Sequence, residues 1–296
     1  MSATAPAGDG AAHGIPAHRV AAHGIPAPST VRRTPTLLIV AHGTRDPEGV
    51  AATEALVARV RELRPELSVA CCYLDLVSPS LPEALARLHG PVVLVPLLLG
   101  AGYHVRVDIP DAVAAAPSLG AVHVADALGP HPLLVDALTD RLAEAGWRSG
   151  HGPVVLAAAG STDPDANADA DAMAALLGER HPCTTVVPSY LCAAGPTPAE
   201  AVSALRAAGH DRVAVAEYLL SPGFFARKAA RSGAWTTSAP LGPHDAIAQL
   251  VTLRYDEALR RATTRGRAGG VREHIRGARS HPGTEGRTTA PFTHGA

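Results

Sequence analysis

Two histidines in glycine-containing turns are the residues best suited to metal chemistry in this sequence. His42 and His104 each follow a short apolar segment, and Asp75 follows a third such segment. If these segments are parallel strands of one sheet, the three side chains face one cleft, because ligands bind beyond the carboxyl ends of such strands. Neutral imidazole and carboxylate suit divalent iron, cobalt, nickel or zinc. We therefore interpret His42, His104 and Asp75 as candidate metal-binding and catalytic residues.

The elements that must position these residues alternate regularly along the chain. Short apolar or β-branched runs, typical of strands, occupy residues 37–41, 67–74, 91–98, 121–125, 153–158, 184–191, 212–220 and 234–237. Stretches of helical composition occupy residues 48–64, 80–89, 108–116, 131–145, 165–180, 197–208, 224–231 and 243–260. This alternation predicts an α/β fold in which parallel sheets are covered by helices on both faces.

The sequence also repeats itself. LLIVAHGTRDP (37–47) is echoed by VVLAAAGSTDP (154–164) at an offset of 117, and VVLVPLLLGAGYH (92–104) by VAVAEYLLSPGFF (213–225) at an offset of 121. We infer two tandem, duplicated α/β units, over 36–149 and 150–261, which face each other across a cleft. Residues 1–35 and 262–296 have low-complexity compositions, so both are expected to be disordered tails, the second of them basic.

The second repeat serves as an internal control for the candidate site. Ala159 stands in place of His42, Phe225 in place of His104, and Cys192 near the place of Asp75. The glycines of the same turns are kept in both repeats, so the framework is repeated and the ligand-type residues are not. This indicates one working site, in the first unit, with the second unit as its lid or wall. By the same logic His131 and His244, which recur in Gly-Pro-His, are predicted to start helices.

Composition excludes several classes of protein. With 296 residues and 47% hydrophobic content the chain can bury real cores. Its longest apolar stretch, around 91–102, is too short to span a membrane, and the first residues do not resemble a signal peptide. The four cysteines show no CxxC spacing, which favours a reducing cytoplasm. The segment between the tails is acidic, which argues against a nucleic-acid partner.

Three segments then point to a family. AHGTRDPEG, YLDLVSPSLPEAL and PLLLGAGYHVRVDIP resemble the sirohydrochlorin chelatases of the two-domain class over residues 36–260. The resemblance implies a lyase that inserts Fe²⁺ or Co²⁺, as a metal substrate, into sirohydrochlorin for sirohaem or cobalamin synthesis. His42 and His104 match the metal-binding, catalytic histidines of the family, and Asp75 falls where many relatives have glutamate. The chain lacks the CxxC of some long relatives, so no iron–sulfur cluster and no permanently bound cofactor are expected.

The expected substrate suggests further binding residues. Sirohydrochlorin carries eight carboxylates, which guanidinium groups can bind in a bidentate manner, and its macrocycle can lie against an aromatic ring. The candidate substrate-binding residues are Arg45, Tyr103, Arg106, Arg227 and Lys228. We expect a monomer. The alternatives are a chelatase for another tetrapyrrole or for nickel, and a carrier that binds metal or tetrapyrrole without turnover.

Overall fold

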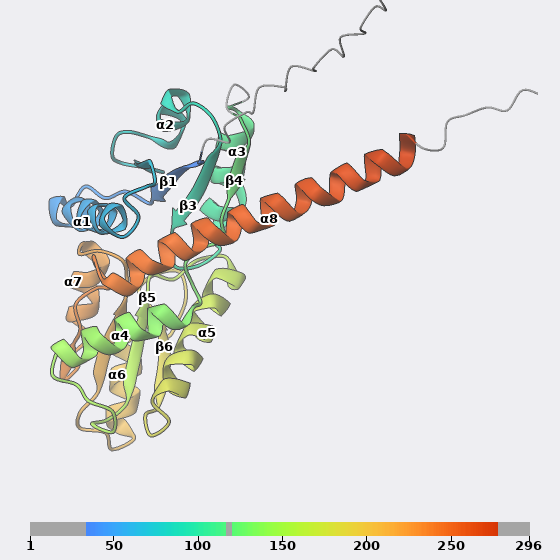
Figure 1. Ribbon diagram of the computed structural model, residues 1–296. Coiled ribbons are helices and arrows are strands. Elements are labelled where there is room, and N and C mark those ends of the chain that lie inside the picture. Colours follow the sequence, from blue (N-terminus) through green and yellow to red (C-terminus); the bar gives the residue numbers. More distant parts are fainter. Residues whose placement is uncertain (1–33, 117–119, 278–296) are drawn as a thin grey trace, which may run out of the picture. The chain divides into compact units, whose positions relative to one another are not determined.

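The strands of the protein form two parallel sheets, one from each half of the sequence (Figure 1). The computed structural model describes residues 34–116 and 120–277, which belong to one compact unit. Within these residues the N-terminal sheet has the strand order β2-β1-β3-β4 and the C-terminal sheet the order β6-β5-β7-β8. The strands are β1 (Thr36–Ala41), β2 (Val69–Tyr73), β3 (Val92–Leu97), β4 (Val122–Val124), β5 (Val154–Ala158), β6 (Val186–Tyr190), β7 (Ala214–Tyr218) and β8 (Thr236–Thr237).

Helices cover both faces of each sheet, which confirms the predicted fold class. They are α1 (Pro47–Leu63), α2 (Leu81–Arg87), α3 (Ile109–Ala114), α4 (Pro132–Glu144), α5 (Pro164–Arg180), α6 (Pro198–Ala207), α7 (Phe224–Ala230) and α8 (Asp245–Gly277). A short π-helix, η1 (His104–Asp108), lies between β3 and α3. The apolar strands β1, β3, β5 and β7 are buried on both sides, as strands between two helical layers must be.

The helix starts repeat between the halves because their capping residues repeat. Asp46 caps α1 and Asp163 caps α5, each followed by proline in the first turn. Ser80 and Thr197 begin α2 and α6, and each forms a capping box with the glutamate three residues further on. These side chains satisfy amide donors that the first helical turn leaves without partners. The same local chemistry therefore builds the same element twice.

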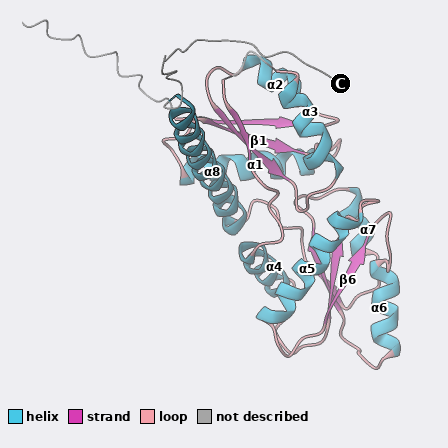
Figure 2. Ribbon diagram, turned by 90° about the vertical axis from the view of Figure 1, so that its right-hand side faces the viewer, coloured by secondary structure: helices cyan, strands magenta, loops and turns pink. Residues whose placement is uncertain are grey.

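The last helix of each half covers the sheet of the other half. Helix α4 follows the N-terminal sheet in sequence but packs on β7 and α5, whereas α8 follows the C-terminal sheet and packs on α1, β3 and β4 (Figures 1 and 2). On the opposite faces, α2 and α3 cover the N-terminal sheet, and α6 and α7 cover the C-terminal sheet. As a result one continuous apolar core contains residues of both sheets together with α1, α4, α5 and α8.

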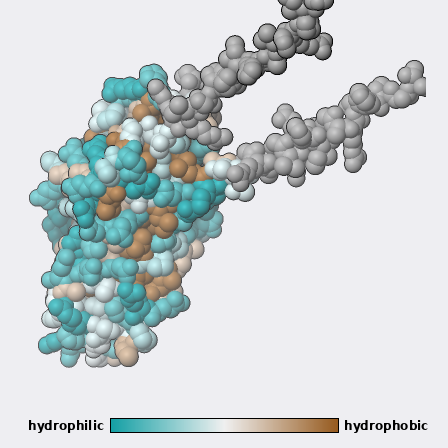
Figure 3. All heavy atoms as spheres, in the orientation of Figure 1, coloured by the Kyte–Doolittle hydropathy of each residue, from teal (hydrophilic) through white to brown (hydrophobic). Residues whose placement is uncertain are grey.

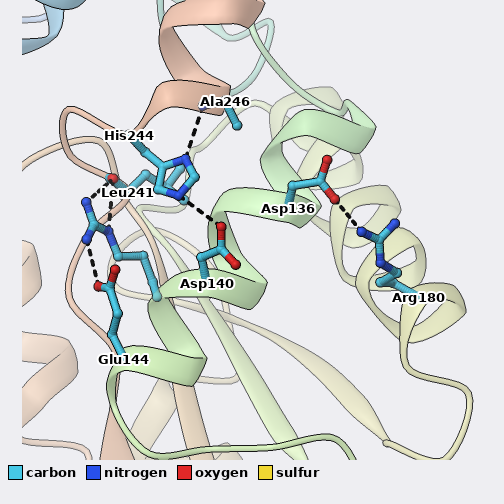
Figure 4. A network of polar contacts seen from close by, with 8 residues as sticks. Asp136, Asp140, Glu144, Arg180, Leu241, His244 and Ala246 are labelled. Atoms are coloured by element: carbon cyan, nitrogen blue, oxygen red, sulfur yellow. Dashed lines mark hydrogen bonds and ion pairs between the residues drawn. The ribbon is translucent and has the colours of Figure 1, made fainter.

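Two histidines cap α4 and α8, the helices that cover the sheet of the other half, which confirms the role predicted for these histidines. The Nδ1 atoms of His131 and His244 each accept a hydrogen bond, 3.1 Å long, from the backbone amide two residues further on, at the starts of α4 and α8. Nε2 of His244 also lies 3.2 Å from Asp140 of α4 (Figure 4). Asp136 of α4 in turn pairs with Arg180 of α5 at 2.6 Å. These contacts fix α4 to its two helical neighbours.

Two arginines strengthen this crossed packing of α4 and α8 by equivalent contacts. Arg141 of α4 donates to the carbonyl of Leu241, just before α8, and Arg254 of α8 donates to the carbonyl of Leu128, just before α4. Each arginine thus satisfies a carbonyl at the approach to the other helix. The pairs occupy equivalent positions of the two repeats, so the halves are joined by the same contact made in both directions.

The boundary predicted for the C-terminal tail differs from the structure. Helix α8 continues to Gly277, past residue 262, through a segment that is rich in arginine and glycine and contains no proline. The remaining predicted tail residues, 1–33 and 278–296, lie outside the described residues. No helix in the described part of the chain is long and apolar enough to cross a lipid bilayer. The face drawn in Figure 3 mixes hydrophilic residues with smaller apolar areas.

Candidate functional site

His42 and His104 lie side by side at the carboxyl edge of the N-terminal sheet. In the order β2-β1-β3-β4 the strands that follow β1 lie on both sides of it, so the topological switch point, where ligands bind in open parallel sheets, is between β1 and β3. His42 directly follows β1, and His104 is the first residue of η1, after β3. The two imidazole rings are 4.8 Å apart between centroids and perpendicular to each other. The strand order therefore brings together two nitrogen donors that are 62 positions apart in the sequence.

Hydrogen bonds indicate which nitrogen of each imidazole is free. Nδ1 of His104 lies 2.5 Å from a carboxylate oxygen of Asp108, and Nδ1 of His42 lies 3.3 Å from the carbonyl oxygen of Gly43. Both partners are acceptors, so in each neutral ring Nδ1 carries the hydrogen and donates it. The lone pair is then on Nε2 in both histidines. Such a carboxylate or carbonyl partner orients a metal-binding imidazole and fixes its tautomer.

The turn that presents His42 requires glycine at the next position. Gly43 has a φ of +98°, and a Cβ atom there would lie 1.9 Å from the carbonyl oxygen of Asp75. Gly160 repeats the geometry, with a φ of +85° and a Cβ position 2.0 Å from the carbonyl oxygen of Cys192. The two turns share one backbone shape, and only the first carries an imidazole.

A cavity of about 640 Å³ opens beside the two histidines. Both halves of the chain line it, and the Tyr218 hydroxyl bridges them by donating to the carbonyl of Leu99 at 3.0 Å. Its walls are mostly apolar. The side chains that stand in place of the site residues in the second repeat form the opposite wall. The lining includes His42, Thr44, Leu76, Leu97, Tyr103 and His104 from the first half, and Ala159, Ser161, Asn167, Cys192, Phe224 and Phe225 from the second.

Asp75 is not gathered with the histidines. Its side chain is exposed, one carboxylate oxygen accepts a hydrogen bond from the Leu76 amide at 2.8 Å, and the residue is absent from the cavity lining. Among the described residues, no group of three or more histidine, cysteine, aspartate or glutamate side chains is placed to hold a metal ion. The structure therefore brings together two of the three predicted donors, and a catalytic role of Asp75 stays a prediction.

The predicted substrate-binding cations have different surroundings. Arg45 is exposed and forms no ion pair with any residue of the described ranges, whereas Lys228 donates to the backbone carbonyl of Leu191. Arg106 and Arg227 are held by aspartates of the opposite half. The sequence did not indicate these partners because they are distant along the chain.

An exposed aromatic ring stands at the cavity in each half. Tyr103 is 62% exposed and lines the cavity, and its contact with a macrocycle stays a prediction. Phe224 occupies the equivalent position of the second repeat and also lines the cavity. Large apolar rings exposed beside an apolar cavity mark a ligand-binding surface.

Asp108 is the site residue that sequence reasoning missed. It lies four positions after His104, a spacing that brings two side chains of a helical turn together. In the second repeat both partners are replaced, by Phe225 and by the buried Ala229. The joint replacement of the histidine and of the aspartate four positions later is the signal that could have identified the pair.

Comparison with known proteins identifies the family of the chain. The sequence model of the CbiX family matches residues 36–145 and again residues 153–258. A family model that matches both repeats covers most of the chain. The chain belongs to the CbiX family.

Individual relatives are more distant. The sirohydrochlorin cobaltochelatase of Priestia megaterium is 26% identical over 65% of this chain and 66% of its own length, so the match spans just under two thirds of that relative. The sirohydrochlorin ferrochelatase of Bacillus subtilis (strain 168) is 30% identical over 63% of this chain and 74% of its own length. The solved structure of SirB from Bacillus subtilis with Fe³⁺ shares the fold, with a TM-score of 0.66 at 24% identity over 75% of this chain and 94% of that one.

Proposed function

We propose that the protein is a sirohydrochlorin chelatase, which inserts Fe²⁺ or Co²⁺ into the tetrapyrrole as its metal substrate. The observation that carries the proposal is the pair of perpendicular imidazoles, His42 and His104, at the edge of an apolar cavity. Their free Nε2 atoms are the kind of donor that divalent iron and cobalt accept. The relatives named cobaltochelatase and ferrochelatase support the same reaction.

The chemistry requires a loosely held metal and an acceptor for protons. Insertion removes two pyrrole N–H protons and delivers a partly desolvated cation to one face of the ring. Two imidazoles hold a cation from one side and leave its other positions open to water and to the pyrrole nitrogens. As the metal moves to the ring, the Nε2 atoms of His42 and His104 become free, and each can accept one of the two protons before it passes to water. Asp108 keeps the His104 ring in the orientation that this transfer needs.

The cavity suits a ligand that is apolar in the middle and charged around the edge. Carboxylates are costly to bury without partners, so those of sirohydrochlorin stay at the rim while the macrocycle enters the apolar cavity. Arg45 and Lys228 are exposed cations available to them, and Tyr103 offers a ring to the macrocycle. Because one chain supplies both walls, a second copy is not needed to complete the cavity, which supports a monomer.

The test is metal insertion into metal-free sirohydrochlorin, followed by the loss of its absorption spectrum. Protein is present at a small fraction of the substrate, and Fe²⁺ and Co²⁺ are compared under anaerobic conditions against metal without protein. A chelatase converts many equivalents of substrate per chain, and the ratio of the two rates identifies the preferred metal. A signal that stops at one equivalent per chain would instead show a carrier, and the proposal would be wrong.

A further inference from the structure

Two ion pairs cross between the halves at the edge of the cavity. Nη1 of Arg227, in α7, lies 2.6 Å from a carboxylate oxygen of Asp46, the residue that caps α1. Nη1 of Arg106, in η1, lies 2.8 Å from Asp165 and 3.5 Å from Asp163, the residue that caps α5. Each arginine therefore ties the helical segment that follows β3 or β7 to the start of the first helix of the opposite half.

The two pairs are copies of one contact. Arg106 and Arg227 occupy equivalent positions of the repeat, two residues after His104 and Phe225 respectively. Asp46 and Asp163 are likewise equivalent, each just before the proline of an Asp-Pro. At this edge the imidazole of the first repeat is replaced by a phenyl ring in the second, whereas the arginine and the aspartate are the same in both repeats. The ion pairs thus belong to what both halves need, not to the metal chemistry of the first half alone.

Each aspartate has a second role that keeps it in place. The other carboxylate oxygen of Asp46 accepts the amide of Glu48, and that of Asp163 accepts the amide of Asp165. The contact with Arg227 lowers the pKa of the Asp46 carboxyl below its ordinary value. The aspartates are therefore fixed anions, and the side chain of Arg227, which is 59% exposed, is the movable member of its pair.

We propose that Arg106 and Arg227 are exchangeable latches, which hold the two halves together through these aspartates in the free protein and pass to the carboxylates of sirohydrochlorin when it binds. The second part of this statement rests on the proposed function. Throughout, "the latches" means the pair of Arg227 with Asp46 and the pair of Arg106 with Asp163 and Asp165.

The energetics favour exchange over a permanent bond. Exposed ion pairs contribute little to stability, so an arginine can leave one carboxylate for another at small cost. An arginine that offers two parallel donors to a substrate carboxylate makes a stronger contact than one that touches an aspartate through a single nitrogen. Because the aspartates and the substrate compete for the same guanidinium groups, removing the aspartate charge must tighten substrate binding. If each aspartate instead only positions its arginine for the substrate, removing the aspartate charge should weaken substrate binding.

The first arm of the test measures the affinity for metal-free sirohydrochlorin by fluorescence titration. Asp46→Asn removes the charge of one latch, and asparagine remains a good helix cap. We expect Kd to fall by about two- to fivefold, the range set by an exposed ion pair, and to fall similarly in the double variant Asp163→Asn with Asp165→Asn. Arg227→Gln should raise Kd, and adding Asp46→Asn to it should change nothing further.

The matched control is Asp136→Asn, which breaks the pair with Arg180 between α4 and α5, a contact outside the cavity lining. This variant loses an exposed arginine–aspartate pair of the same length and should bind sirohydrochlorin as the wild type does. If Asp46→Asn and the double variant leave Kd unchanged or raise it, the exchange is refuted. A wild type that fails to bind sirohydrochlorin contradicts the proposed function instead.

The second arm needs no substrate. Amide hydrogen exchange of residues 99–104 and 219–225, which line or flank the cavity, is compared between the wild type and a variant with all three aspartates changed to asparagine. We expect faster exchange of both segments when the latches are broken, and no change in Asp136→Asn. Equal exchange in the triple variant and the wild type would show that the pairs do not close the halves together, whatever the titrations give.

Discussion

A buried carboxyl group in β7 should make the stability of the fold depend on pH. The side chain of Glu217 is 3% exposed, and by strand alternation it shares a face with Val215 and Leu219, under α6 and α7. Oε2 has no hydrogen-bond partner among the described residues. Burial without a partner disfavours the charged form and raises the pKa of Glu217 to about 8. The unfolded chain exposes the same group to water, where its pKa is near the ordinary 4.5.

The sign and size of the effect follow from the two pKa values. A carboxyl whose pKa is raised in the folded state contributes stability below the unfolded pKa, and this contribution is lost as pH rises towards the folded pKa. Each pKa unit corresponds to about 1.4 kcal/mol, so the complete loss is about 5 kcal/mol. Between pH ~5 and pH ~8 the free energy of unfolding should fall by about 3.5 kcal/mol because of this residue alone.

The assay is urea unfolding of the wild type and of Glu217→Gln at pH ~5, ~6.5 and ~8, with the m-value checked for constancy. Glutamine keeps the size of the side chain and does not titrate, so the difference between the two proteins should grow in favour of the variant as pH rises. Glu179→Gln, at an exposed position of α5, is the control and should run parallel to the wild type. Parallel profiles for Glu217→Gln would refute the reasoning.

Three further predictions concern the site and the core. His42→Ala or His104→Ala should lower metal insertion by orders of magnitude with unchanged circular dichroism, and near-normal rates would contradict the assignment. Asp108→Asn should lower kcat about 10- to 100-fold with little change in the KM for sirohydrochlorin, because it orients His104; an effect on KM alone would argue against that role. Ile39→Ala in β1 should cost about 2 to 5 kcal/mol, and fluorescence of Trp147 and Trp235, near the C-terminal sheet, should report the same lowered unfolding midpoint; an unshifted midpoint would show that the halves unfold separately.

Local chemistry explains why so much of the fold could be predicted. Each strand lies within one residue of its predicted range because it is a short apolar run, and most helices begin where Asp, Ser, Thr or His caps them. The repeat then fixed the number of sheets and directed attention to His42 and His104. Their ring contact, 4.8 Å between centroids, depends only on which strands are neighbours.

What could not be predicted depends on contacts between distant segments. Sequence order suggests that α4 covers the sheet it follows, and no local pattern shows that it packs on β7. The aspartates that hold Arg106 and Arg227 are 59 and 181 positions away along the chain. Burial of Glu217 is equally hidden, because a lone glutamate in a strand is usually assigned to the solvent face.

Because α4 and α8 each cover the sheet of the other half, the order of synthesis affects how the chain folds. The N-terminal sheet is made first, yet one of its faces is covered by α8, from residues 245–258, which are made long afterwards. Until those residues leave the ribosome, Leu37 and Ile39 lack part of the layer that buries them. The first half must therefore wait in an incomplete state for the last helix, and during that interval its apolar face is open to chaperones or to misassociation with other nascent chains.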